Sequence, residues 1–260
     1  MEPITSTTVA VAAASWSGAK LLGPTFENMG KDLNQLYQKG IDKIIANATK
    51  KTPNIDDGGQ TNLRVTRDVF WNGSFSDESI CAEYFGGILA ASRSNDGKND
   101  AGIFYLDIIK SLSSGQLKMH YLIYRMLNKL LISNDQKKSL NPAQEGELGK
   151  EKLFFVFSQN LSKQFGEEDV LAILHGLSAK NIIGSFQTKT HESENKTPLF
   201  YYAEISPKSL GIQLFAMANN KFKNWYQFST QDFGDFDEII LPEYFSQSKA
   251  DLLIKTGHSE

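Results

Sequence analysis

The sequence predicts a mainly α N-terminal helical domain followed by a smaller α+β, winged-helix-like C-terminal domain. Helical apolar periods dominate the chain up to Ile132, and beyond a polar stretch they give way to short apolar runs around an exposed polar loop. We therefore expect a helical domain over residues 1–133, a linker over 134–150, an α+β domain over 151–245 and a frayed tail over 246–260.

The segment from Ser113 to Ile132 has the composition of a buried central helix. Projected at about 100° per residue, its apolar side chains cover most of the circumference, whereas an amphipathic surface helix shows a narrower apolar band. Ser113 and Gln116 offer a capping box, in which the hydroxyl bonds forward to a backbone N–H and the amide reaches back. The rest of the first domain is expected to pack around this helix.

The helical period also predicts helices over residues 26–49, 63–71, 77–92 and 101–112. Two adjacent glycines, Gly86 and Gly87, lie in the middle of the third, where each costs roughly 1 kcal/mol relative to alanine. Such a cost indicates that another helix crosses closely at that point.

Residues 5–22 are predicted to form a helix of small side chains. Ala10, Ala14 and Gly18 stand four apart on one face, a spacing that lets two backbones approach closely. We expect this face to pack on a neighbouring helix or to mediate self-association. A membrane-surface role for the same helix is an alternative, for which Trp16 and Lys20 are the only interface-type anchors.

The second domain is predicted from a change of pattern. The expected order is an apolar run over 153–157, a helix over 167–177, an extended segment from 182, a polar tip over 189–197, a strand over 199–205 and a helix over 207–219. Helix, strand, exposed loop, strand and helix is the order of a winged-helix-like module. Glutamates in the exposed loop would repel phosphate, so this module favours contact with protein over nucleic acid.

Composition limits the broad class of the protein. A net charge of −3 over 260 residues argues against a globally basic nucleic-acid binder, although it allows a local basic patch. The single cysteine, Cys81, cannot form an internal disulfide. The run Val9–Ala14 resembles the apolar centre of a signal peptide but has no basic leader, and no window approaches the roughly 18 apolar residues of a membrane span. We expect a cytoplasmic protein, with peripheral contact at the inner membrane as an alternative.

No motif predicts a catalytic, cofactor or metal site. Cys81 with His120 or His175 could be a nucleophile and base, but core packing is the simpler interpretation of Cys81 and His120. His191 has glutamates nearby but no second histidine at ligand spacing. The acidic glycine-bearing loops lack calcium-loop spacing, and no phosphate-binding loop pattern occurs. We expect no cofactor and a protein that acts without catalysis, and an enzyme with an unrecognised site stays an alternative.

Basic side chains are the other candidate contacts. The region from Ile108 to Asn134 contains no acidic residue, and three cations of the central helix share one side, so we expect this basic stripe to reach solvent. For the arginines of the 63–71 helix, the ordinary alternative is ion pairing with Asp68 or with a neighbouring acid. For the stripe, it is coverage by an acidic C-terminal run of Asp232, Asp235, Asp237 and Glu238. The candidate partner or anion contacts are Arg64, Arg67, Lys118, Arg125 and Lys129.

Three segments of the first domain carry a family resemblance. They are Ala19-Lys-Leu-Leu-Gly-Pro-Thr25, Ser76-Asp-Glu-Ser-Ile-Cys-Ala-Glu-Tyr-Phe-Gly-Gly-Ile-Leu-Ala90 and Asp107-Ile-Ile-Lys-Ser-Leu-Ser113. Together they resemble the bacterial Abi-alpha (abortive infection alpha) proteins. It covers roughly residues 18–132, with a weaker echo at Ser209–Phe215. These are packing and capping patterns, and the resemblance supplies no catalytic residues.

The resemblance implies a role in resistance to bacteriophage, in which an infected cell stops growing or dies before the phage matures. We therefore expect an antiviral defence protein that works through a protein partner or self-association. One alternative is a nucleic-acid-binding regulator that uses the basic stripe or the winged-helix-like module. Another is a membrane-associated effector that acts through the N-terminal helix, without a transmembrane span.

Overall fold

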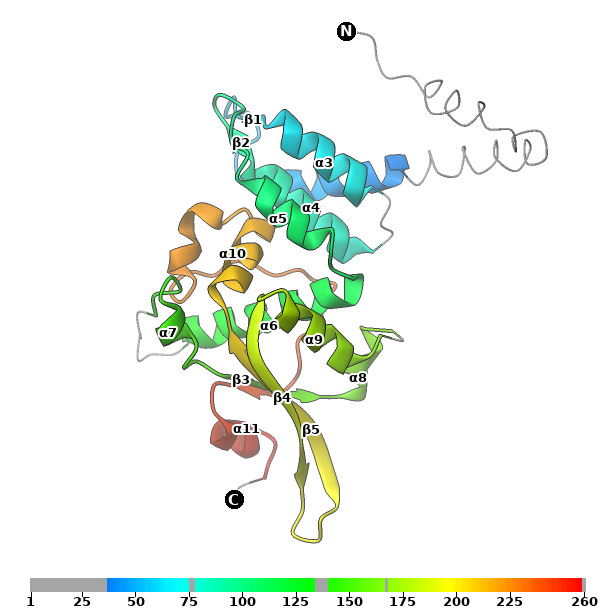
Figure 1. The fold of residues 1–260 in the computed structure, drawn as a ribbon, viewed down its shortest axis with the longest axis vertical. Helices are drawn as coiled ribbons and strands as arrows, with labels where there is room; N and C mark the ends of the chain where they lie inside the picture. Colours follow the sequence, from blue (N-terminus) through cyan, green and yellow to red (C-terminus); the bar gives the residue numbers. More distant parts are fainter. Residues whose placement is uncertain (1–36, 75–77, 134–139, 167, 259–260) are drawn as a thin grey trace, which may run out of the picture.

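The structure, a computed structural model, describes residues 37–74, 78–133, 140–166 and 168–258. The first described element is a helix over residues 37–50. Four helices follow, α3 (Leu63–Gly73), α4 (Ser79–Ala91), α5 (Gly102–Ile109) and α6 (Ser114–Ser133). The two-residue strands β1 (Gln60–Thr61) and β2 (Arg93–Ser94) pair antiparallel and join the start of α3 to the end of α4 (Figure 1).

The rest of the described chain builds a small antiparallel sheet with helices around it. Its strands are β3 (Leu153–Phe157), β4 (Ile183–Glu192), β5 (Pro198–Pro207) and β6 (Phe245–Ser246), in the order β4-β5-β3-β6. The helices are α7 (Glu145–Leu148), α8 (Gln159–Lys163), α9 (Val170–Ala179), α10 (Ser209–Ala218), the 3₁₀ helix η1 (Phe222–Gln227) and α11 (Lys249–Lys255). Strands β4 and β5 form a long hairpin that projects away from the helices (Figure 1). This mixture of helices and a small antiparallel sheet is the coarse fold class that the sequence predicts.

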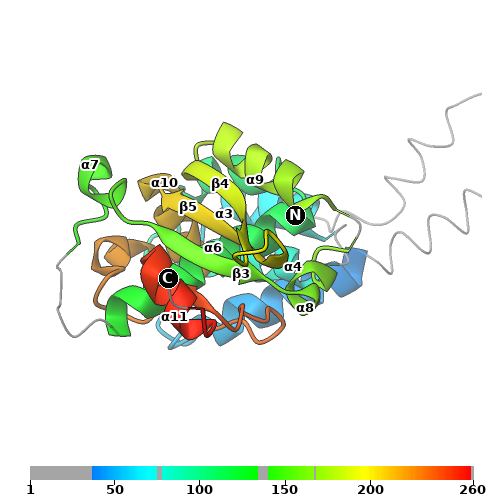
Figure 2. The ribbon, with the colours of Figure 1, turned by 90° about the horizontal axis from the view of Figure 1, so that it is seen from below.

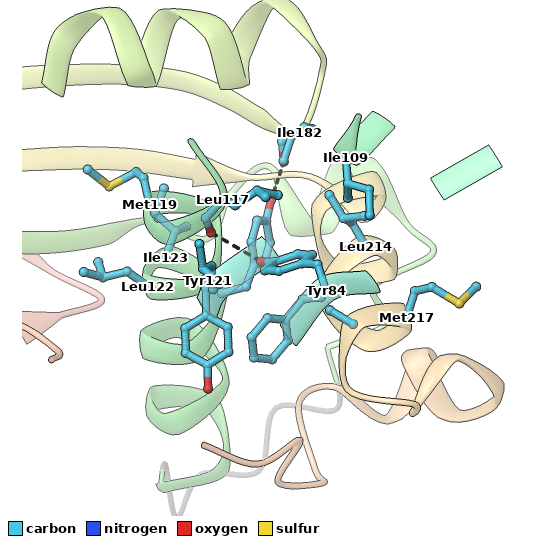
Figure 3. Packing of buried hydrophobic residues seen from close by; sticks show 14 of the residues in the cluster. Tyr84, Ile109, Leu117, Met119, Tyr121, Leu122, Ile123, Ile182, Leu214 and Met217 are labelled. Carbon is cyan, nitrogen blue, oxygen red and sulfur yellow. Dashed lines mark hydrogen bonds between the residues drawn. The ribbon is translucent and has the colours of Figure 1, made fainter. Parts of the chain in front are cut away.

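Helix α6 lies at the centre of the core, as its composition predicts. Leu122, Met126 and Leu127 are at most 1% exposed. Figure 3 shows side chains of α4, of α10 and of Ile182, just before β4, packed beside those of α6. The predicted capping box is confirmed. The Gln116 N–H donates to Ser113 Oγ at 3.1 Å, and the Ser113 N–H donates to Gln116 Oε1 at 2.9 Å.

The close crossing predicted at the glycine pair of α4 is also confirmed. An added Cβ at Gly86 would stand 2.9 Å from the carbonyl oxygen of Ile44 in the 37–50 helix. At Gly87 it would stand 1.8 Å from the carbonyl oxygen of Ala218 at the end of α10. Because glycine has no side chain, the 37–50 helix and α10 can each pack closely on the backbone of α4, one at Gly86 and the other at Gly87.

We predict that Gly87→Ala destabilises the protein by about 1–3 kcal/mol or more, because the new methyl group must displace the backbone of α10. Urea unfolding followed by circular dichroism measures the loss. Gly146→Ala in α7 is the matched control, since a Cβ there meets nothing within 4 Å. Equal midpoints for wild type and Gly87→Ala would show that the crossing is looser than the structure has it.

A buried histidine joins α6 to its neighbours. The His120 imidazole is completely buried, its Nδ1 accepts a hydrogen bond from the Tyr84 hydroxyl of α4, and its Nε2 donates to the Gly211 carbonyl of α10 at 3.0 Å. Burial lowers the pKa of His120 from 6.5 to about 3, and the bond to Gly211 offsets only part of this shift. The imidazole is therefore neutral in the folded protein.

The pKa shift of His120 predicts acid sensitivity. The unfolded chain takes up a proton at His120 below about pH 6.5 and the folded chain does not, so stability falls by ~1.4 kcal/mol per pH unit from there toward pH 3. Urea unfolding between pH 7 and pH 4.5 measures how the free energy of unfolding depends on pH. In His120→Gln this dependence should be weaker by the contribution of one proton, ~1.4 kcal/mol per pH unit. Tyr84→Phe keeps the imidazole and should keep the slope. An unchanged slope in His120→Gln would contradict the assignment.

Two boundaries of the predicted domains differ from the structure. Residues 246–258 are not a frayed tail, because α11 lies in this range and its Leu252 is 0% exposed, packed on Phe154 and Tyr202. Within the predicted linker, Leu140 and Leu148 are buried. In both segments, a few apolar side chains pack against the rest of the protein, although their neighbours in the sequence are polar.

The buried core is also continuous across the predicted division. Helix α10, which follows the sheet in sequence, packs against α4 and α6 of the first domain. Figure 3 shows Leu214 of α10 near Tyr84 of α4, and the ring centroid of Phe215 in α10 lies 5.3 Å from that of Tyr121 in α6. The helical part and the sheet part therefore share one core.

Candidate protein-contact surface

The inner face of the sheet extends farther than the helices that cover it. In the register of β3 and β5, Phe155 pairs with Ala203 and Phe157 with Tyr201, so these side chains share one face. Phe155 and Ala203 are completely buried under the helices, whereas Phe157 is half-buried and Tyr201 is 58% exposed. The outer face of the sheet is covered instead by α11, and Figure 2 shows α9 and α11 on opposite sides of the strands.

A groove of about 650 Å³ opens where this coverage ends. It lies between α8, the first turn of α9 and the hairpin. We call its exposed apolar part, formed by Phe157, Val170, Leu171 and Tyr201, the hairpin face. The polar or small residues of the groove are Ser158, Gln159, Ser162, Lys163, Gly166, Asp169 and Thr188.

Local capping explains how the walls of the groove are held. Ser158 Oγ accepts from the Leu161 N–H at 3.1 Å and begins α8, and Asp169 Oδ1 accepts from the Leu171 N–H at 3.1 Å and begins α9. The second cap places Leu171, 43% exposed, at the mouth of the groove. Among the described residues, neither histidine nor cysteine lines the groove.

The electrostatics around the groove are close to neutral. Helix α9 contains no charged residue, and its exposed side consists of Leu171, Ala172, His175 and Ala179. The groove itself holds one cation, Lys163, and one anion, Asp169. The β4–β5 hairpin from 183 to 207 carries two lysines against three glutamates. A polyanion gains little from such a surface, whereas an apolar protein segment can bury the hairpin face.

The basic stripe predicted on α6 is not free, and Arg125 does not reach solvent. Its side chain is 2% exposed. Its Nε and Nη2 donate to the two carboxylate oxygens of Asp235 at 2.6 and 2.8 Å, and its Nη1 donates to Asp232 at 2.5 Å. These bonds hold the pKa of both aspartates below their ordinary value. Coverage by the acidic C-terminal run, the ordinary alternative, therefore holds at Arg125.

The other candidate cations are also paired. Lys118 lies 3.0 Å from a Glu78 carboxylate oxygen, and Lys129 lies 3.3 Å from Asp235. On α3, Arg67 binds Asp68 at 2.7 Å, as the ion-pair alternative predicts, and Arg64 stands 4.0 Å from Asp100. The structure therefore does not bring these residues together as one cationic site. Ala10, Ala14 and Gly18 lie outside the described residues.

We predict that Arg125→Ala destabilises the protein by about 1.5–3 kcal/mol, because hydrogen bonds to two carboxylates are lost. Hydrogen exchange should also rise at the Phe233 and Gly234 amides, which bond to the partners of Arg125. Lys129→Ala, which removes a half-exposed ion pair with the same Asp235, should change stability by less than about 1 kcal/mol. Equal effects of the two substitutions would contradict the central place of Arg125.

The histidines and the cysteine considered as chemical groups occupy different places. His120 uses both ring nitrogens on Tyr84 and Gly211, so it is not available as a base for the buried Cys81. His175 packs its ring on Phe186, with ring centroids 4.9 Å apart. Across the described part of the chain, no three or more His, Cys, Asp and Glu side chains gather as a metal site. No described helix is long and apolar enough to cross a bilayer.

Sequence reasoning missed the groove because its walls come from β3, α8, α9 and the β4–β5 hairpin, and these elements meet only in the folded chain. The available signal was Leu171, an apolar residue in the exposed row of α9. Comparisons with protein-family models, with curated proteins and with solved structures find no match for this chain.

Proposed function

We propose that this protein acts without catalysis, by binding an amphipathic helix of a partner protein on the hairpin face. The observation that carries the proposal is that the sheet continues outward past the helices α6 and α9 that pack on its base. A sheet with one uncovered apolar face is completed by a second layer, and a helix is the element that already fills this layer nearer the core. The near-neutral groove favours an uncharged apolar stripe on that helix.

The order of elements supports a winged-helix-like arrangement for this part. After α6 and the short helix α7 come β3, α8, α9 and the β4–β5 hairpin, and the three strands lie in the order β4-β5-β3. In helix-turn-helix proteins that read DNA, the second helix enters the major groove. Here that helix is α9, and its exposed side offers no cation, which favours a protein partner over nucleic acid.

We propose further that this contact serves defence against bacteriophage. This part of the proposal is supported by the resemblance of residues 18–132 to the Abi-alpha proteins, which implies loss of the infected cell before the phage matures. A contact protein suits such a role, because engaging a phage or host component is enough to trigger or to execute it.

Plaque assays test both parts. Expression of the full chain should lower the plaque count of at least one phage in a broad panel. Leu171→Asp and Tyr201→Asp should each abolish that protection, because a carboxylate on the hairpin face would have to be buried unpaired against the partner. Ile254→Asp, at an exposed apolar position of α11 outside the hairpin face, should leave protection unchanged.

The outcomes separate the two parts of the proposal. Equal plaque counts with and without the gene, across the whole panel, would remove the defence role. Protection that survives both Leu171→Asp and Tyr201→Asp, with all proteins expressed at equal levels, would remove the hairpin face as the contact surface.

A further inference from the structure

Two histidines that are far apart in sequence meet on the outer face of the hairpin. The ring of His191, near the end of β4, and the ring of His258, just after α11, have centroids 5.7 Å apart and planes at 80°. In the sequence, 66 residues separate these two positions, so no motif spacing could indicate the pair. The docking of α11 on the sheet brings them together (Figure 1).

The position of His258 is fixed by the end of α11. The His258 N–H donates to the Leu253 carbonyl at 2.8 Å, and the Gly257 N–H donates to the Ile254 carbonyl at 3.1 Å. Gly257 has φ +78°, so this is the Schellman arrangement in which a left-handed glycine turns the chain out of the helix. Because Leu253 is itself buried, the cap fixes the backbone of His258 relative to the body.

His191 is held by its strand. It pairs with Phe200 across the hairpin, and the register shifts immediately after it, between His191 and Glu192. Such an irregularity locally re-aims side chains. The Phe200 ring contacts both imidazoles, at centroid distances of 5.0 Å from His191 and 5.5 Å from His258. One aromatic ring therefore supports the two histidines side by side.

A ring nitrogen of this pair has no partner. Nδ1 of His258 is enclosed by protein atoms and makes no hydrogen bond. A polar atom withdrawn from water normally finds a partner within the protein, so an unpaired one calls for an explanation. A coordinated metal ion is one partner that an imidazole nitrogen accepts.

From the ring geometry and the unpaired nitrogen, we propose that His191 and His258 bind one divalent transition-metal ion of the zinc type. Zinc lies ~2.0 Å from an imidazole nitrogen, so two rings on one tetrahedral ion have centroids about 5–6 Å apart. The observed 5.7 Å falls in this range. Imidazole ligands select zinc, copper or nickel over magnesium or calcium.

Bound metal would cross-link the end of α11 to the hairpin. Each ligand comes from a different element, β4 and the residue that follows the cap of α11, so the ion binds the folded chain better than the unfolded one. Metal binding therefore stabilises the docked α11 by mass action. The site lies on the outer face of the sheet, opposite the hairpin face, so the inference does not rest on the proposed function.

Titration of the untagged full chain with Zn²⁺ tests the site. Calorimetry should show one ion per chain, and saturating Zn²⁺ should raise the melting temperature. His191→Gln and His258→Gln should each weaken binding at least tenfold and remove the thermal shift. His175→Gln, which changes an exposed histidine on α9, should keep the wild-type affinity.

A second readout reports the ligands directly. Co²⁺ bound by imidazole nitrogen should give visible absorption bands in wild type and His175→Gln that are absent from His191→Gln and His258→Gln. One-to-one Zn²⁺ binding that both substitutions leave intact would overturn the assignment, as would the absence of one-to-one binding to the wild-type chain.

Discussion

The enclosure of α6 is the constraint on which the rest of this structure depends. A helix surrounded by protein must find partners for every polar side chain that it carries into the interior. His120 bonds to α4 and α10, and Arg125 binds the aspartates of the 232–235 segment. Asn128 donates to the carbonyls of Phe228 and Gln231 and accepts from the Phe233 N–H. These buried polar groups of α6 thus hold α4, α10 and the 228–235 segment against the core.

This constraint also determines how the hairpin is presented. The sheet shares the core of α6 at its base, where Phe155 and Ile205 are completely buried, so the hairpin emerges from a rigid support. Its inner face ends in the exposed hairpin face, and its outer face carries the His191 and His258 pair beside α11. A contact surface on a firmly anchored strand pair keeps its shape without a partner, which lowers the entropic cost of binding.

Local patterns in the sequence predicted much of the helical part, because the responsible interactions are short in sequence. The all-round apolar composition of α6, the Ser113 and Gln116 cap and the crossing at Gly86 and Gly87 follow from spacing and backbone sterics. The burial of Arg125, the docking of α11 and the groove at Leu171 and Tyr201 could not be predicted in this way. Each of these depends on segments that meet only after folding, and a lone Arg or Leu in a sequence carries no record of its distant partner.

Hydrogen exchange in increasing urea tests most directly whether α6 joins the helices and the sheet into one cooperative unit. The account predicts that the slowest amides of α4 and of β5 exchange through the same global opening, with equal free energies and equal urea dependence. Protection of β5 that is lost at lower urea, while α4 remains protected, would show two separately folding parts and would contradict the shared core.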